Sequence, residues 1–555
     1  MAAAILLTLA AQTASYTFTI EDPAEPRVEA RLVLGELEPD ARDLLLTMPE
    51  GFAYVQLPEP RLEGEVRRVG EGPAVIRGGA YSWTIDPADA REVELRWSVP
   101  LDHRTLDGIR GRDEYEYPYL AADHGMLVMA TMALVPGEGT AHDREFPITI
   151  EFDLPSGWEV HAPWPQDEQG RYRPATLNDV RDDLVAIGQW DTYEEEVDGM
   201  AVTFAFAPGQ ETLKQGVVQQ AAPIVAGMID HFGGKVQDRY LVLFGDPQPG
   251  GYGGSPKTNS MTLFLSPELP LDFALDGIVH LIAHEFHHTW MRARCQPVSD
   301  LRFVAEGYTD YFAYRIPWQI GLADDATFKA TLEQKLVELE AAQAASEMDL
   351  FTAGGDAFFQ GGDSYRATYA GGLIHALWLD LALRGLEEPS STEAVLRALY
   401  EDPRWQDGTR PQPSDLWACI ERLGGVEIAQ RARELAATAG FADWQAALAA
   451  VGVELERSTA PGSLQMRANF NGTTMGLSDP AGAAARVGLL PGDRLIEVNG
   501  VAVETEADVR RAFPELLDGE LRLRLERDGE ELLIKTTRPT DVRYRFADKV
   551  IERLR

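Results

Sequence analysis

The sequence has little cysteine and no long apolar segment. Its 555 residues include two cysteines, Cys295 and Cys419, which are too few for a disulfide framework and lack the spacing of a thiolate metal site. No stretch approaches the roughly 20 apolar residues that a membrane-spanning helix needs. We therefore expect no membrane span. At 45% hydrophobic residues, the chain is rich enough in apolar side chains for large cores, and its length predicts about three domains.

Lysine is also scarce. The chain has seven lysines, and its 89 acidic residues outnumber the 50 basic ones, which gives a formal charge of −39. A surface this acidic repels phosphate groups and anionic lipid, so nucleic acid is excluded as a partner. Solubility, or adaptation to a salty medium, explains the charge more simply than an acidic site that selects basic substrates.

The first residues, MAAAILLTLAAQTAS, form an apolar run with small residues at positions 10, 11 and 14 but without a positive n-region. We predict residues 1–14 as an export segment, and a buried first strand or helix is the alternative. The corresponding location is extracytoplasmic, periplasmic or secreted, and a cytoplasmic location stays open.

A histidine-rich helix is predicted over Asp276–Arg294, because apolar residues recur there at helical intervals and Asp276 stands at an N-cap position. His284 and His288 are one turn apart on one face, with Glu285 beside them, in the pattern His-Glu-x-x-His. Two imidazoles on a rigid helix suit Zn²⁺, which in catalytic sites takes three protein ligands and leaves a position for water. A third ligand is required.

The segment VAEGYTDYFAY supplies that ligand. Glu306 follows His288 by 18 positions, which leaves room for a loop and a second helix, and we predict it as the third ligand of one zinc ion per chain. Asp310, one turn further on, is a candidate to orient a ligand imidazole. His-Glu-x-x-His alone arises by chance in many chains, but the two carboxylates favour a metal site. His280 is interpreted as a hydrogen-bonded histidine near the site, and His287 as structural or exposed.

These motifs carry a resemblance. The segments HEFHHTW and AEGYTDYF resemble the glycyl aminopeptidase family of gluzincin metallopeptidases. The resemblance implies a thermolysin-like, mainly helical catalytic domain that hydrolyses peptides or proteins with zinc. In that chemistry Glu285 is the general base.

Upstream of this region, alternating short strands and turn residues predict an antiparallel sheet or sandwich over residues 15–207. The segment HGMLVMATMALVPG resembles the N-terminal β domain of the same family. The family likeness also makes the strand Met261–Leu265 an edge strand along the cleft, preceded by a glycine-rich loop. In that loop the resemblance implies four substrate-binding residues, Gly251, Tyr252, Gly253 and Gly254.

The loop departs from the family pattern Gly-Gly-Leu-Glu-His, because it contains no acid. In related aminopeptidases that acid holds the α-ammonium group of the substrate. Its absence leaves two readings open: an endopeptidase, or an aminopeptidase that holds the ammonium group with another acid.

A further helix is predicted over Ser364–Arg384, and there Tyr369 falls on the catalytic tyrosine of the family. A phenol donates a hydrogen bond at neutral pH and suits an oxyanion. The family's lysine is replaced by Gly371, and Tyr365, one turn before Tyr369, could serve in its place. We interpret His375 as packed within the helix.

The last part of the chain, residues 458–540, resembles a bacterial PDZ domain through MGLSDPAGAAARVGLLPGDRLIEVNGVAV. Such domains add a peptide terminus as a strand to a sheet edge. A docked module with a blocked groove is the alternative. Residues 541–555 are expected as a tail.

The sequence therefore predicts a multidomain α+β protein: an N-terminal antiparallel β domain, a catalytic domain over residues 208–457, and a PDZ domain. The predicted activity is zinc-dependent, aminopeptidase-like peptide hydrolysis. An endopeptidase, a non-catalytic peptide-binding protein on the same scaffold and a zinc hydrolase of another substrate are the alternatives.

Overall fold

The computed structural model describes residues 11–38, 44–49, 51–52, 55–56, 63–68, 75–87, 90–102, 117–138, 142–246, 252–265, 271–294, 298–345, 347–356, 358, 362–407, 410–461, 468–478, 487–490, 492–505, 507–509, 520–527, 529–537 and 540–555. The chain divides into two compact units. The first comprises residues 1–298, 312–323 and 396–412, and the second comprises residues 299–311, 324–395 and 413–555. Helix α4 (Thr309–Gln319) passes without interruption from the second unit into the first.

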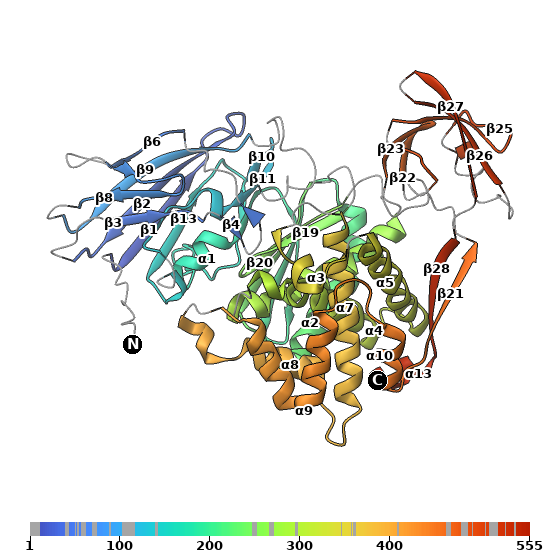
Figure 1. Cartoon of the computed structure of the whole chain (residues 1–555). Coiled ribbons are helices and arrows are strands. Elements are labelled where there is room, and N and C mark those ends of the chain that lie inside the picture. The colour runs from blue at the N-terminus through green and yellow to red at the C-terminus, as the bar shows by residue number, and fades with distance from the viewer. Residues whose placement is uncertain are drawn as a thin grey trace. The chain divides into compact units, whose positions relative to one another are not determined.

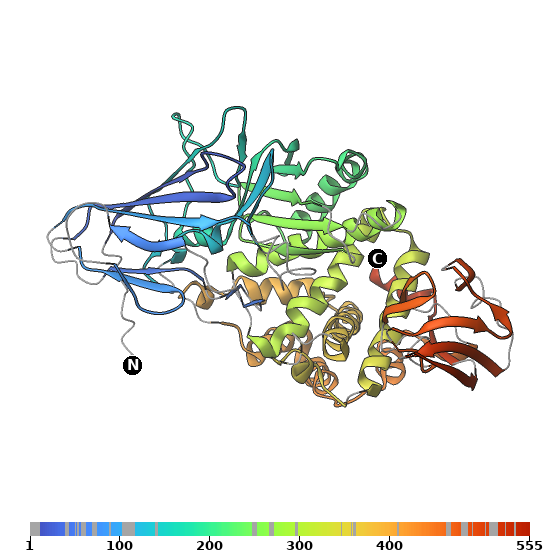
Figure 2. The same cartoon turned by 90° about the horizontal axis from the view of Figure 1, so that it is seen from above.

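The first unit begins with an N-terminal β domain (Figures 1 and 2). Its larger sheet has the order β13-β1-β2-β9-β6, with β1 (Thr13–Thr19), β2 (Arg27–Gly35), β6 (Glu63–Arg68), β9 (Val93–Pro100) and β13 (Ile148–Asp153). A second sheet has the order β12-β3-β8-β7, with β3 (Leu44–Thr47), β7 (Ile76–Arg77), β8 (Ser82–Ile85) and β12 (Val135–Pro136). Alternate residues of both sheets, among them Phe18 and Trp83, form one hydrophobic core. N-terminal β sheets are present as predicted, although β1 pairs in parallel with β13.

Two smaller groups of strands complete this domain. A four-stranded sheet has the order β10-β11-β15-β14, with β10 (Tyr119–Leu120), β11 (His124–Val128), β14 (Glu159–His161) and β15 (Leu184–Gly188). The other group is the pair β4 (Gly51–Phe52) and β5 (Val55–Gln56). Between the strands lie the 3-10 turn η3 (Met129–Thr131) and helix α1 (Leu177–Asp182), whose first turn is closed by a capping box from Thr176.

The sheet that carries the candidate site has the order β16-β17-β18-β20-β19. Its strands are β16 (Asp191–Val197), β17 (Met200–Phe206), β18 (Arg239–Phe244), β19 (Tyr252–Pro256) and β20 (Ser260–Leu265). Helices α2 (Glu211–His231) and α3 (Leu271–Arg294) pack on each other, and α3 also packs on β19 and β20. The expectation that Met261–Leu265 is the edge strand is wrong, because β19 lies outside β20. Glycines, which weaken a strand signal, gave β19 the appearance of a loop.

A buried aspartate links the hairpin β19–β20 to the N-terminal β domain through hydrogen bonds. Asp183 accepts hydrogen bonds from the backbone N–H of Asn259 at 2.7 Å, the hydroxyl of Ser260 at 3.0 Å and the indole of Trp164 at 2.9 Å. Burial, together with the negative charge of Asp179, raises the pKa of Asp183 above its usual range. These bonds fix the start of β20 and hence the edge strand paired with it.

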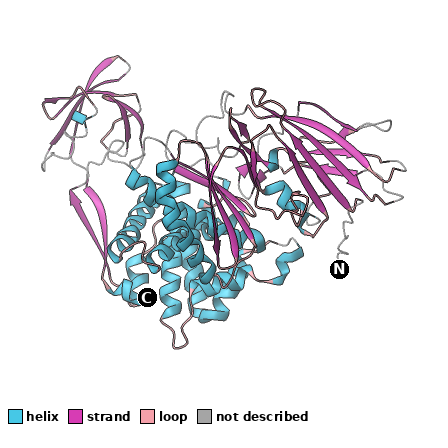
Figure 3. Cartoon of the chain, turned by 180° about the vertical axis from the view of Figure 1, so that it is seen from behind, coloured by secondary structure: helices cyan, strands magenta, loops and turns pink. Residues whose placement is uncertain are grey.

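The second unit is mainly helical (Figure 3). It contains the 3-10 turn η5 (Ser299–Leu301), the π-helix η6 (Phe303–Tyr308), α5 (Asp325–Ala345), α6 (Leu350–Ala353), α7 (Gly362–Arg384), α9 (Pro413–Ala436) and α10 (Trp444–Ala450). Helix α8 (Thr392–Tyr400) leads into the 3-10 turn η8 (Pro403–Asp407). Gly425, at φ 84°, divides α9 into two helices.

The C-terminal part of this unit is a small β domain set on a two-stranded ribbon. The domain contains β22 (Ala468–Asn471), β23 (Thr474–Ser478), β24 (Arg494–Val498), β25 (Val501–Ala502), β26 (Glu520–Arg527) and β27 (Glu530–Thr537). The ribbon pairs β21 (Leu455–Pro461), which precedes the domain, with β28 (Thr540–Phe546), which follows it (Figure 1). Residues expected as a tail thus form β28 and helix α13 (Lys549–Leu554).

The ribbon is docked on helix α5. Glu340 of that helix accepts hydrogen bonds from Arg457 at 2.5 Å and from the Tyr544 hydroxyl at 2.5 Å, so one carboxylate holds both strands. Desolvation raises the pKa of the Glu340 carboxyl, but the hydrogen bonds from Arg457 and Tyr544 and the charge of Arg457 together bring it below its ordinary value. Among the described residues, no helix combines the length and the apolar content needed to cross a membrane.

Candidate metal centre and catalytic site

Helix α3 carries the His-Glu-x-x-His motif at its centre. The helix begins at Leu271, so the expectation that Asp276 is its N-cap is wrong, whereas its end at Arg294 agrees with the prediction. The segment LDFAL before Asp276 is itself helical and contains two leucines and an alanine, which favour a helix. Their preference for the helix is stronger than the preference of the single Asp276 for an N-cap position. The motif therefore begins more than three turns after the start of α3.

The two motif histidines face each other. The Nε2 atoms of His284 and His288 are 3.2 Å apart, and both side chains are buried. Two nitrogens that bind one zinc ion at about 2.0–2.1 Å with a tetrahedral angle are separated by roughly 3.3–3.4 Å. The spacing of this pair thus fits a shared zinc ion.

Glu306 lies on the π-helix η6, which continues directly into α4. His284, His288 and Glu306 each contribute one ligand atom to a group in which these atoms lie within 4.8 Å of one another. Single π-helical turns recur at functional sites, and here the wider turn precedes the helix that carries Asp310. The sequence predicted a helix at this place but gave no sign of its π character.

Close packing holds Glu306 beside helix α7. A Cβ added to Gly307 would lie 2.4 Å from Cα of Gly372, and one added to Gly372 would lie 2.0 Å from the carbonyl oxygen of Phe303. Only glycine fits at these two positions, so η6 and α7 approach backbone to backbone. As a result the Tyr369 hydroxyl reaches Glu306 and donates a hydrogen bond to its Oε2 at 2.7 Å.

The environment of Tyr369 favours its neutral form. Burial, followed by the negative charge of Glu306, raises the pKa of the Tyr369 phenol well above its ordinary value. The phenol is therefore a proton donor across the neutral range. That property is the one that stabilisation of an oxyanion requires.

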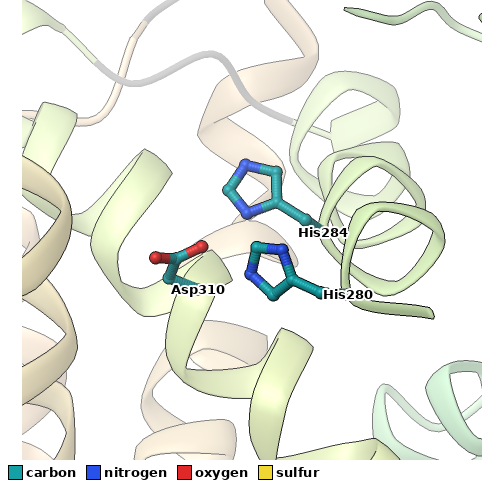
Figure 4. A group of neighbouring side chains, drawn as sticks. All are labelled: His280, His284 and Asp310. Carbon is teal, nitrogen blue, oxygen red and sulfur yellow. The ribbon is translucent and has the colours of Figure 1, made fainter. Parts of the chain in front are cut away.

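Asp310 belongs to a second group of neighbouring side chains, with His280 and His284 (Figure 4). Their ligand atoms also lie within 4.8 Å of one another, and Figure 4 shows the two rings and the carboxylate facing one another. The ring of His280 stacks on Tyr314, one turn after Asp310 on α4, with centroids 4.2 Å apart. Asp310 also forms an ion pair with Lys335 at 3.4 Å. This arrangement suits a carboxylate that orients an imidazole.

The two other histidines singled out in the sequence are packed in apolar surroundings. His287 is fully buried against Phe232 and Phe312, and burial, with a smaller effect of His284, lowers its pKa to about 3. His375 accepts the Tyr308 hydroxyl at Nδ1 (2.7 Å) and donates from Nε2 to a backbone carbonyl (2.8 Å). Both side chains are fully buried, which fits the interpretation of His375 as packed within the helix.

Edge strand β19 lies against Glu285. Gly254 pairs with Leu263 of β20, and a Cβ at Gly254 would lie 2.7 Å from Cγ of Glu285 and 2.8 Å from its Oε1. At Gly253 an added Cβ would instead meet the ring of Phe264 at 2.6 Å. Gly251 and the side chain of Tyr252 lie outside the described residues. Absence of a side chain at Gly254 therefore creates the space that Glu285 occupies.

Substitution of Gly254 tests this contact. Gly254→Ala is expected to lower kcat roughly 100-fold with zinc content unchanged, because a displacement of about 1 Å at a catalytic group has an effect of that order. Gly245→Ala is the control for a methyl group added elsewhere on the same sheet, since that methyl group would lie 3.8 Å from the Thr262 hydroxyl and not against Glu285. Equal losses of kcat in both variants, measured with metal-loaded protein, would contradict a specific role of Gly254.

The fold defined by these elements is similar to the folds of an aminopeptidase N family protein and of an M1 zinc metallopeptidase. The PDZ domain is identified by a family model that matches residues 477–527. By sequence, no curated protein matches the chain.

Two solved structures show how far the similarity of fold extends along the chain. An aminopeptidase N family protein from Idiomarina loihiensis is similar over 98% of this chain and 100% of its own, with 17% identity and a TM-score of 0.76. An M1 zinc metallopeptidase from Deinococcus radiodurans is similar over 79% of this chain and 95% of its own, with 13% identity and a TM-score of 0.51. At these identities the likeness establishes the fold, and at that level the resemblance read from the motifs is confirmed.

Proposed function

We propose that the chain is a zinc-dependent peptidase. The observation that carries the proposal is the group formed by His284, His288 and Glu306, whose ligand atoms lie within 4.8 Å of one another with Glu285 adjacent on the same helix. Two imidazoles and one carboxylate are the donor set of catalytic zinc sites of this kind. Each chain would hold one zinc ion through these three residues, with Asp310 orienting an imidazole.

When bound, zinc would supply a Lewis acid that polarises the scissile carbonyl and lowers the pKa of the attacking water. Glu285 takes the proton of that water and delivers it to the nitrogen of the departing amine. The Glu285 side chain is buried, and a Cβ at Gly254 would lie 2.8 Å from its Oε1, so the carboxylate lies directly beside strand β19. Glu285 is therefore the general base and, in the second step, the general acid.

Tyr369 supplies a hydrogen bond that strengthens as negative charge develops on the carbonyl oxygen. Its neutral phenol already donates to Glu306, so a turn about the C–O bond redirects the same proton. Among the described residues β19 is the outermost strand of its sheet, and an extended substrate could be added beside it as a further strand. Gly253 and Gly254 let the substrate backbone approach that strand closely.

We further propose an aminopeptidase-like action on peptides. A variant of the Deinococcus radiodurans enzyme was solved with a Tyr-Ser-Ala substrate, and its fold is shared at a TM-score of 0.50 over 79% of this chain. The PDZ domain would hold a peptide terminus by the strand addition typical of its class.

The test compares Tyr-Ser-Ala and a longer peptide in free and N-acetylated forms, with products identified by mass spectrometry. We expect cleavage of the free peptides from their amino end, loss of cleavage after chelation and recovery with zinc. Cleavage of both forms at internal bonds would indicate an endopeptidase. No zinc-dependent cleavage of any of these peptides would overturn the proposed function.

A further inference from the structure

The imidazole of His124, the first residue of β11, lies between two carboxylates. Its Nδ1 is 2.8 Å from Oδ1 of Asp123, and its Nε2 is 2.9 Å from Oδ1 of Asp246. The His124 side chain is buried, and the rings of Tyr119 and Trp190 stand nearly perpendicular to the imidazole, with centroids 5.8 and 5.7 Å away. The ring is therefore held in an orientation that directs both nitrogens at acids.

These two contacts determine how many protons the ring carries. An ionised carboxylate only accepts hydrogen bonds, and a neutral imidazole has one N–H. Two hydrogen bonds from His124 to two carboxylates therefore require the imidazolium form, with an N–H on each nitrogen. Burial lowers the pKa of His124, but the hydrogen bonds and negative charges of Asp246 and Asp123 together raise it above its ordinary value.

The imidazolium joins two sheets. His124 belongs to the sheet β10-β11-β15-β14 of the N-terminal β domain, whereas Asp246 follows β18 of the sheet that carries the candidate site. Asp183 links the same N-terminal domain to the start of β20. Because β18 and β20 are parallel, the His124 contact lies at the opposite end of this pair of strands.

Backbone pairing connects the end of β18 to the candidate site. Gly245, the residue before Asp246, donates its N–H to the carbonyl of Leu263 on β20 at 3.1 Å. Leu263 pairs with Gly254 of β19, where an added Cβ would lie 2.8 Å from Oε1 of Glu285. The position of the end of β18 therefore affects the strand that lies against the proposed general base.

We propose that His124, as an imidazolium between Asp123 and Asp246, is a positioning residue for the peptide hydrolysis proposed above: it holds the end of β18 to the N-terminal β domain and so keeps β20 and β19 in place beside Glu285. The proposal rests on the proposed function for its effect on the reaction and on the two carboxylate contacts for its geometry.

This role depends on pH. When His124 loses one ring proton, one N–H remains for two carboxylates, so one contact becomes a repulsion between lone pairs and the other loses its charge assistance. The raised pKa of His124 means that the stabilisation is fully present below about pH 6.5, the ordinary value, and is lost as the pH rises through the raised value. Among the described residues, the ionised groups that contact the ring are Asp123 and Asp246.

Hydrogen exchange of strands β18, β19 and β20, measured by mass spectrometry, tests the role without any substrate. At pH 6 we expect exchange roughly 10-fold faster in His124→Gln than in the wild type, because a charge-assisted contact is lost, and a much smaller difference at pH 9. His161→Gln is the control: His161 is on β14 of the same sheet, its Nε2 is 3.8 Å from the exposed Glu159, and the variant should match the wild type. An equal difference between His124→Gln and the wild type at both pH values would show loss of packing only and would overturn the proposal.

Asp123→Asn is the rescue variant. A neutral imidazole can then donate to Asp246 and accept a hydrogen bond from the new amide, so at pH 9 this variant should exchange more slowly than the wild type. Exchange at pH 9 as fast as in the wild type would reject the proton count. The His124 ring signal, assigned by its absence from His124→Gln in histidine-labelled protein, should titrate with a midpoint above 6.5, and a midpoint at or below that value would also overturn the proposal.

The reaction supplies the last readout. The ratio of kcat between the wild type and His124→Gln should be about 10 at pH 6 and approach 1 at pH 9, with zinc content equal in both, because a displaced β19 disturbs Glu285. A ratio of 1 at pH 6 would overturn the effect on the reaction. If the wild type cleaved no peptide, the proposed function would fail, and the exchange measurements would still decide whether His124 positions these strands.

Discussion

Replacement of Glu285 by glutamine is expected to abolish most peptide hydrolysis while the protein stays folded and keeps its zinc. The amide has nearly the same shape and cannot accept a proton from water, so the loss should be that of general base catalysis, roughly 10²- to 10⁴-fold in kcat. Glu285 is not one of the three proposed ligands, which is why its loss should leave zinc content unchanged. The measurement is kcat and KM with a free peptide, alongside metal analysis of the purified variant.

Glu285→Asp is the conservative control. The aspartate keeps a carboxylate, but its side chain is one methylene shorter and the carboxylate lies further from Gly254 on β19. We therefore expect a kcat between those of the wild type and Glu285→Gln. Near-normal kcat in Glu285→Gln would remove Glu285 as the base, and a parallel loss of zinc would show that the residue acts on the metal site instead.

The local motifs were predictable because each depends on residues close in sequence. His284 and His288 share a helix face at any position within α3, so their pairing followed from spacing alone. Helix α7 ends at the predicted Arg384 and begins two residues before the predicted Ser364, because its helical periodicity is uninterrupted.

What the sequence did not yield depends on contacts between distant segments. The sequence predicts a loop at β19, because glycines are uncommon in strands. Here they are needed because Phe264 and Glu285 fill the space that a side chain at Gly253 or Gly254 would take. The π-helical turn at Glu306 depends on the glycine contact with α7, some 65 residues later. The return of β28 to β21 could not be foreseen, since the charged partner Glu340 stands on a helix more than a hundred residues away.

The glycine contact places Tyr369 beside Glu306 although Gly371 stands where the family has a lysine. Gly371, which replaces that lysine, lies where a Cβ would meet Leu350 at 2.4 Å, and Gly372 meets η6. The two consecutive glycines therefore bring α7 close to both α6 and η6. This packing offsets the larger loss of conformational entropy that glycine undergoes on folding. The position of Tyr369 relative to Glu306 depends on that approach more than on the identity of the replaced lysine.

Glu306→Ala is expected to reduce zinc affinity by more than the ~10- to 100-fold that loss of an outer hydrogen-bond partner causes, because a donor atom is removed rather than its support. Hydrolysis should fall in parallel at limiting zinc. Asp310→Asn separates the two cases, since it leaves the three proposed ligands in place and should weaken zinc binding only within that smaller range. Glu338→Ala, which removes an acid that contacts Lys335 but belongs to neither group of ligands, is the control for charge loss nearby.

The order of the three zinc affinities, measured by competition with a chelator, is the decisive result. We expect Glu338→Ala to match the wild type, Asp310→Asn to be weaker and Glu306→Ala to be weakest. Because Tyr369 donates to Glu306 and not to Asp310, Glu306→Ala should also leave the Tyr369 hydroxyl without its acceptor, so zinc added in excess should restore only part of kcat. Unchanged zinc affinity in Glu306→Ala would reject Glu306 as a ligand, and full recovery of kcat at saturating zinc would show that its bond to Tyr369 contributes nothing to the reaction.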